Sequence, residues 1–266
     1  MLVKMVTGLL YLMLLKIKKH KPNELSILIL SNGFSFCTQQ KSVFLPKNNS
    51  NVFDVDIVSK FLDEQNLVFD IVHVIQISTA STIVPEEMFD NQNAAFYLSK
   101  GINLKNNEQV VFDVLKPYNQ VIVYPEPSNT MEVLKKLFPN LKSKHATSIL
   151  LGPLNQFSMG TPKKKLFVHL RDGAFDLFLF QSSQLLFFNS FKQNNIDEFL
   201  YYLFYITEQF YLNTENFKLA FLGEYECYKE YYEGVQNYHN DIIFLDVPSE
   251  NSHSKHPVPF LENKVA

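Results

Sequence analysis

Apolar and polar positions follow one pattern in two separate parts of the chain. The first stretch is "ELSILILSNGFSFCTQQKSVFLP", Glu24 to Pro46, and the second is "KKLFVHLRDGAFDLFLFQSSQLLFFN", Lys164 to Asn189. In each, an apolar run of strand length reaches a turn that ends in glycine, then returns as a second and a third run. The pattern predicts two three-stranded meanders, with strands over 25–31, 34–39 and 42–45, and over 165–170, 174–180 and 184–191.

After each meander the hydrophobic period changes from that of a strand to that of a helix. A helix over 54–65 and a strand over 69–78 are expected in the first half, and a helix over 195–212 and a strand over 217–222 in the second. Apolar residues cover most of the circumference of the 195–212 segment, which predicts a buried or centrally packed helix. The remaining expected elements are helices near 90–100 and over 127–138 and 224–238, and strands over 109–115, 119–125, 145–152 and 241–247.

Each half therefore has the order βββαβ with further α and β units appended. A repeat of this length indicates two duplicated lobes rather than a solenoid. We expect a first lobe over 22–155 and a second over 156–247. The polar, proline-containing segment 248–266 is expected to be a disordered tail.

The first 21 residues differ from the rest. An apolar run from Met5 to Leu15 is followed by a lysine-rich stretch that ends at Lys21. The run is shorter than the 20 or so residues of a membrane-spanning helix, and no signal-type cleavage pattern follows it. One interpretation is an amphipathic anchor that touches a membrane surface through Met5–Lys21. The other, which we favour, is a leader segment outside the core fold.

Composition excludes some partners and suggests a compartment. A formal net charge of −3 gives no basic footprint for nucleic acid, so no nucleic-acid partner is expected. The two cysteines, Cys37 and Cys227, are not spaced as a metal or redox motif, and we interpret them as buried thiols of a cytoplasmic protein. A long-range disulfide or a reactive thiol is the alternative. Arg171 is the one arginine among 24 basic lysine and arginine residues.

The doubled βββαβα unit, each copy opening with a strand–x-x-Gly–strand hairpin, resembles the actin-like ATPase (ribonuclease H-like) fold, an α/β fold with two duplicated lobes. Five segments, "LSILILSNGFSFC", "VP…MFD", "LLFFNSF", "EFLYYLFYITEQ" and "LAFLGE", are similar to a family of uncharacterised bacterial proteins with that fold. The resemblance extends from about residue 22 to about residue 247. Pilus-assembly ATPases are more distant members of the same superfamily.

That resemblance implies a defined nucleotide site. Both hairpins of an active member read D-x-G; the aspartates hold a hydrated Mg²⁺, and the glycines let backbone N–H groups approach phosphates. Here Ser31 and Arg171 stand where the two aspartates would be, and Asp172 is one position late, which turns its side chain to the other face of a strand. The third motif, normally Gly-Gly, keeps only Gly223, followed by Glu224.

The candidate nucleotide- or phosphate-binding residues, in this degenerate form, are Ser31, Asn32, Gly33, Arg171, Asp172, Gly173, Gly223 and Glu224. The same glycines have a simpler interpretation as turn residues between packed strands. Arg171 is interpreted either as an anion-binding residue or as one paired with Asp172 or Asp176. We assign no catalytic residue and no metal ligand.

The function expected from these features is that of a non-catalytic binding or scaffold module, a pseudo-ATPase with an unidentified protein partner. The alternative is a nucleotide-binding protein, or an ATPase or phosphotransferase, with a rearranged site that uses Asp172, Asp176 or Asp70. ATP or another nucleotide is the cofactor that this alternative requires. A third hypothesis keeps nucleotide binding without hydrolysis, with Arg171 as a metal-free clamp on the phosphates. No oligomeric state is predicted.

Overall fold

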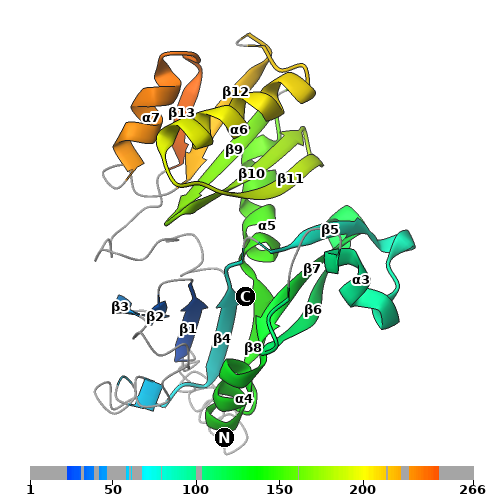
Figure 1. Ribbon diagram of the computed structural model, residues 1–266, viewed down its shortest axis with the longest axis vertical. Coiled ribbons are helices and arrows are strands. Elements are labelled where there is room, and N and C mark those ends of the chain that lie inside the picture. Colours follow the sequence, from blue (N-terminus) through cyan, green and yellow to red (C-terminus); the bar gives the residue numbers. More distant parts are fainter. Residues whose placement is uncertain are drawn as a thin grey trace, which may run out of the picture.

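The computed structural model describes residues 23–30, 33–38, 42–46, 58–59, 61, 68–78, 80–99, 104–160, 162–213, 215–222 and 228–245. Within them the chain forms two five-stranded sheets and one three-stranded sheet. One helix, α5 (Ala146–Ser158), lies between the two large sheets (Figure 1). The leader 1–21 and the tail 248–266 fall outside the described residues, so the predictions made for them are not tested.

The first large sheet has the order β3-β2-β1-β4-β8. Its strands are β1 (Glu24–Ile29), β2 (Gly33–Cys37), β3 (Ser42–Pro46), β4 (Ile71–Gln76) and β8 (Lys142–His145). The first three form the predicted antiparallel meander, and β4 and β8 continue the sheet in parallel with β1. Of the predicted helix 54–65, the described residues Val58, Ser59 and Phe61 are helical, and the Phe61 ring stacks on Phe36 at 4.6 Å.

The second large sheet repeats this arrangement. Its order is β11-β10-β9-β12-β13, with the first three strands antiparallel and the last two parallel to β9. The strands are β9 (Lys164–Arg171), β10 (Ala174–Gln181), β11 (Gln184–Lys192), β12 (Phe217–Leu222) and β13 (Ile242–Leu245). Two sheets with the same strand order and the same directions confirm the duplicated lobes that the repeated hydrophobic pattern predicts.

The third sheet lies beside the first and has the order β5-β7-β6. It consists of β5 (Thr82–Pro85), β6 (Glu108–Leu115) and β7 (Gln120–Pro127), all antiparallel. Helix α3 (Ala94–Ser99) packs on one face through Ala94 and Leu98. Single 3₁₀ turns, η1 (Glu86–Met88), η2 (Asn91–Asn93) and η3 (Lys116–Tyr118), complete this part of the molecule.

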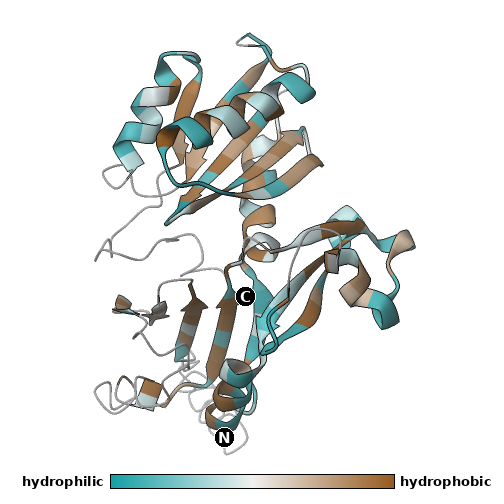
Figure 2. Ribbon diagram, viewed as in Figure 1, coloured by the Kyte–Doolittle hydropathy of each residue, from teal (hydrophilic) through white to brown (hydrophobic). Residues whose placement is uncertain are grey.

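Helices cover the outer faces of the large sheets. Helix α4 (Ser128–Leu137) packs on the first sheet through Met131 and Leu134. Helices α6 (Ile196–Gln209) and α7 (Lys229–Gln236) cover the second sheet, whose strands are mostly brown in Figure 2 while α7 is largely teal. The expectation of a buried or centrally packed helix holds for only one face of α6, because Tyr201 and Tyr205 are 64% and 47% exposed.

Of residues 145–152, predicted to be a strand, His145 ends β8 and residues 146–152 belong instead to α5. The strand at this place in the sheet is β8, whose sequence Lys-Ser-Lys-His is polar (Figure 2) and has no apolar alternation to reveal it. The apolar run that follows is buried on several sides of α5, so a helical period is not visible in the sequence. The expected boundary between residues 155 and 156 falls inside this helix.

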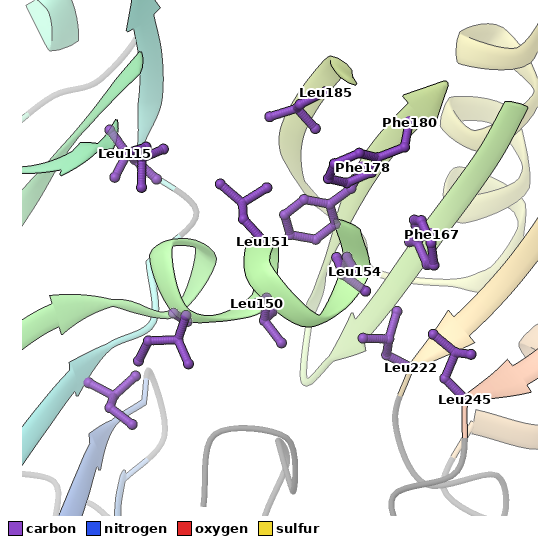
Figure 3. Packing of buried hydrophobic residues seen from close by; sticks show 14 of the residues in the cluster. Leu115, Leu150, Leu151, Leu154, Phe167, Phe178, Phe180, Leu185, Leu222 and Leu245 are labelled. Carbon is purple, nitrogen blue, oxygen red and sulfur yellow. The ribbon is translucent and has the colours of Figure 1, made fainter. Parts of the chain in front are cut away.

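One hydrophobic cluster joins the lobes. Leu150, Leu151 and Leu154 of α5 pack between the small sheet, represented by Leu115, and the second large sheet (Figure 3). From the second sheet the cluster takes the side chains of Phe167, Phe178, Phe180, Leu185, Leu222 and Leu245. Among the described residues, no helix combines the length and the apolar character that a membrane span requires.

Candidate functional site

The two hairpin turns lie where the resemblance predicts them, between β1 and β2 and between β9 and β10. Of the eight candidate residues, Gly33, Arg171, Asp172 and Gly173 are described. Ser31, Asn32, Gly223 and Glu224 lie outside the described residues, so the proposed roles of all eight as phosphate-binding residues stay predictions. Asp172 and Gly173 are exposed at the tip of the second turn, whereas Gly33 is buried.

The two glycines are required for different physical reasons. Gly33 opens β2, and its carbonyl accepts the N–H of Leu30 at 2.9 Å. A Cβ atom on Gly33 would lie 2.4 Å from the Leu45 carbonyl oxygen and 2.8 Å from the Phe44 ring, so β3 leaves no room for a side chain. Gly173 has open space around it but a φ of +65°, which L side chains rarely adopt. Both requirements fit the interpretation as turn residues.

Arg171 forms a buried, two-pronged ion pair with Asp176. Its Nε donates to Asp176 Oδ2 at 2.9 Å, and its Nη2 donates to Oδ1 at 2.6 Å. Both side chains are more than nine-tenths buried. The interpretation of Arg171 as a residue paired with Asp176 is therefore confirmed, and two of its nitrogens are already engaged rather than directed at a ligand.

Asp176 is also the centre of a row of polar side chains across three strands. Strand register sets His169 of β9 and Ser190 of β11 directly opposite Asp176 of β10. His169 Nδ1 lies 2.9 Å from Oδ2, and Ser190 Oγ donates to Oδ1 at 2.5 Å. With the two bonds from Arg171, each oxygen of Asp176 has two contacts, which is about the full accepting capacity of a carboxylate.

The surroundings of Asp176 favour its ionised form. Burial alone would raise the pKa of this carboxyl group, because removing a charge from water is costly. The Arg171 guanidinium and the hydrogen bond with His169 outweigh burial and hold the pKa of Asp176 well below its usual range. Asp176 is thus a carboxylate at neutral pH, and its charge is balanced inside the sheet by Arg171.

The described residues do not fit a Mg²⁺ site. A positive guanidinium stands at the position where the resemblance implies a metal-holding aspartate, and it repels a divalent cation. Asp176, the nearest buried carboxylate, has no accepting position left. In the ranges that the structure describes, no three His, Cys, Asp or Glu side chains converge as a metal site. Asp70 accepts the backbone N–H of Asn23 at 2.9 Å. Both residues lie just before β1 and β4 begin, at the end of the sheet opposite the hairpin turn.

His145 brings the first lobe to this ion pair. It precedes α5, where its Nδ1 accepts the N–H of Thr147 at 3.2 Å and caps the helix. Its ring packs against that of Tyr124 with centroids 4.8 Å apart. Burial lowers the pKa of His145 to about 4; Asp176 opposes this shift and Arg171 adds to it. Asp176 and Arg171 belong to the second sheet, so the protonation of a first-lobe residue, His145, depends on charges of the second lobe.

Asp113 of the small sheet fixes the same helix end. Its Oδ2 accepts the backbone N–H of His145 at 2.8 Å and the Ser148 hydroxyl at 2.6 Å. Its Oδ1 accepts the Tyr124 hydroxyl at 3.1 Å. Burial raises the pKa of Asp113, and these hydrogen bonds partly offset the rise. Three parts of the fold therefore converge at the start of α5.

The sequence revealed only part of this site. Arg171 stood out because it replaces an expected aspartate, and Asp176 was one of its two candidate partners, beside Asp172. His145 and Asp113 were missed, since each sits in a segment with no motif. The spacing of His169, Asp176 and Ser190 on three successive strands was available in the sequence, but it is meaningful only once the strand register is known.

Comparisons with known proteins agree with this architecture. The model of the family described as "Protein of unknown function (DUF3822)" matches residues 14–242. A comparison with curated proteins finds no match. Among solved structures, the chain is similar to a protein from Bacteroides thetaiotaomicron with an actin-like ATPase fold and unknown function, with a TM-score of 0.74 at 22% identity. That match covers 86% of this chain and 93% of the other.

The chain is also similar to a structure described as the PilM–PilN type IV pilus biogenesis complex. The TM-score is 0.58 at 12% identity, and the match covers 84% of this chain and 88% of the other. At these identities the likeness concerns the fold alone. The protein thus has the actin-like ATPase fold that the repeated hairpins predict.

Proposed function

The chain belongs to the DUF3822 family of proteins of unknown function, and we propose that it is a non-catalytic binding or scaffold module, a pseudo-ATPase. Its role is to hold a protein partner, and the two-lobed fold serves as a rigid body. This proposal places the protein in the cytoplasm, where the buried thiol of Cys37 is compatible with reducing conditions.

One observation carries the proposal: the bidentate pair between Arg171 and Asp176 at the second hairpin. An arginine in the aspartate position supplies a fixed positive charge where a metal-dependent site needs a negative one. Both carboxylate oxygens of Asp176 are already engaged by Arg171, His169 and Ser190. The local charge is therefore neutralised within the protein, without a cation and without phosphate groups.

A protein partner is supported by analogy with one structural neighbour. The neighbour named as a complex of PilM with PilN has the same fold at a TM-score of 0.58. A two-lobed actin-like body can therefore serve in an assembly of proteins. The identity of the partner does not follow from fold likeness, because one fold supports many functions.

The experiment is a thermal-shift titration with ATP, ADP and AMP, each with and without Mg²⁺. A nucleotide at 100 times its Kd would stabilise the protein by about 2.7 kcal/mol, which is a shift of a few degrees in Tm. We expect no shift that requires Mg²⁺. Arg171→Ala and Asp172→Ala variants are titrated in parallel as controls on the second hairpin.

Two results would contradict the proposal. The first is a rise in Tm that needs ATP and Mg²⁺ together, with ATP turnover that falls in Asp172→Ala; this would favour the phosphotransferase. The second is stabilisation that is indifferent to Mg²⁺ and lost in Arg171→Ala, which would favour a metal-free nucleotide site. For the partner, the measurement is reconstitution with purified candidates, and binding should not change when ATP and Mg²⁺ are added.

A further inference from the structure

Strand β6 forms an outer edge of the small sheet. In the order β5-β7-β6, it pairs with β7 and with no other strand of the described part of the chain (Figure 1). An edge strand presents unpaired backbone N–H and C=O groups, which are a template for a further strand. Which residues of β6 carry those groups depends on its register with β7.

Two prolines of β7 fix that register's hydrogen-bond pattern. Pro125 and Pro127 face Val110 and Glu108, and a proline cannot donate a backbone hydrogen bond. These pairs are therefore the non-bonded positions of the antiparallel ladder, and the odd-numbered residues of β6 bond to β7. Two contacts agree: Ser128 N–H donates to Asn107 O at 2.8 Å, while Glu108 N–H donates to Lys105 O instead of to β7.

The alternate residues Val110, Phe112 and Val114 consequently direct their N–H and C=O groups away from β7. Two of these side chains are exposed, Phe112 to 36% and Val114 to 44%. The Phe112 ring packs against the Phe89 ring, with centroids 4.8 Å apart, and this contact holds the Phe112 side chain in place. It carries neither a lysine nor a proline within Gln109–Leu115, the residues that proteins commonly place on an edge to prevent pairing.

The edge is complementary to itself in one register. If two copies of β6 lie antiparallel with Phe112 opposite Phe112, then Val110 of each lies opposite Val114 of the other. The same register sets Glu108 opposite Lys116, which is exposed and directly follows β6. On the face that carries Phe112, apolar residues then meet apolar ones and opposite charges meet at both ends, an arrangement that favours pairing. On the other face, Val111 lies opposite Asp113 and Gln109 lies opposite Leu115. Moving the axis to Val114 would instead set Phe112 opposite Lys116.

We propose that two copies of this chain pair through their β6 edges about a two-fold axis at Phe112. The small sheets of the two copies then form one continuous six-stranded sheet. This contact is isologous, as closed dimers require, and it covers the exposed side chains of Phe112 and Val114. The contact uses neither Arg171 nor Asp176, so it stands or falls independently of the function proposed above.

The first test is the molar mass of the full-length protein in solution, measured by light scattering and sedimentation. We expect a dimer, and we expect Val114→Pro to be monomeric, because proline removes the outward N–H of residue 114 and no bond to β7. Val114→Thr keeps that N–H and a β-branched side chain, so this matched control stays dimeric. Circular dichroism and Tm verify that each variant is folded.

The second test fixes the register through cysteines. Residues opposite each other in a bonded antiparallel pair have Cα atoms about 5.5 Å apart, within the range of a disulfide. Phe112→Cys should therefore cross-link two copies under mild oxidation. Val114→Cys is equally exposed but faces residue 110 of the second copy, so it should give no cross-linked dimer above the wild-type background.

Three outcomes would overturn the proposal. One is a wild-type protein that stays monomeric up to about 100 µM, well above the Kd range of specific dimers; the edge would then be open to an extended segment of another protein. Another is a dimer that persists in folded Val114→Pro. The last is cross-linking at residue 114 in preference to residue 112.

Discussion

The Asp113 carboxylate accepts the backbone N–H of His145 at 2.8 Å, so a residue of the small sheet holds the first turn of the helix between the lobes. Asp113→Ala removes this bond and those from Ser148 and Tyr124. We expect a loss of about 2 kcal/mol in the free energy of unfolding, because buried donors are left without an acceptor. Urea denaturation measures it. Asp113→Asn, which keeps one acceptor, should lose less, and equal losses in both variants would contradict this assignment.

The buried pair of Arg171 and Asp176 predicts strong coupling in a double-mutant cycle. Either Arg171→Met or Asp176→Leu alone leaves one buried charge unpaired and should cost about 3–5 kcal/mol of stability. The double variant removes both charges and should be more stable than either single one. Chemical denaturation of the four proteins gives the coupling energy. Additive losses would mean that the two side chains do not depend on each other.

His145 predicts a pH dependence of stability in mild acid. Its pKa is about 4 in the folded chain against 6.5 for an unperturbed histidine, since the side chain is buried. Between pH 6.5 and 4 the unfolded chain binds a proton that the folded chain does not, so stability falls as pH is lowered. The gap corresponds to about 3 kcal/mol at most.

His145→Asn tests this origin. Asparagine can cap α5 in the same way but does not titrate, so the slope of unfolding free energy against pH should become shallower between pH 6.5 and 4. Burial also lowers the pKa of His73 and of His239, which leaves a residual slope in the variant. An unchanged slope would show that other groups account for the whole effect.

The two hairpin glycines predict opposite tolerance to substitution. Gly173→Asn should cost little, because asparagine adopts positive φ more readily than other side chains and the space is open. Gly33→Ala should cost about 2 kcal/mol or more, because the new Cβ meets the Leu45 carbonyl oxygen of β3. Thermal unfolding of both variants, with Gly152→Ala in α5 as a control in open space, measures the difference. A stable Gly33→Ala would show that β3 can move.

The extent to which the sequence predicted the fold follows from where each segment is buried. Strands β1 and β9 to β12 have apolar runs ended by glycine or polar turns, so their type and approximate bounds were predictable. Strand β5 was missed because it is only four residues long and ends in Pro85. Strand β8 was missed because its side chains are polar, and α5 was taken for a strand because it is surrounded by core.

The sequence predicted the candidate site only as departures from the D-x-G pattern of the actin-like fold. Arg171 in an aspartate position showed what the second hairpin lacks. The polar contacts found there depend on Asp176, His169 and Ser190 meeting across three strands. They also depend on His145 of the other lobe lying where the charges of Asp176 and Arg171 act on it. Those meetings depend on strand register and on lobe packing, which local sequence does not specify.

Helix α5 has a consequence for any attempt to study the lobes separately. Its leucines are part of one core with Phe178 and Phe180 on one side and Leu115 on the other. A fragment that ends at residue 155 would cut the helix and leave this apolar surface in water. Neither half therefore possesses a complete interior, and the chain should melt in a single cooperative transition rather than lobe by lobe.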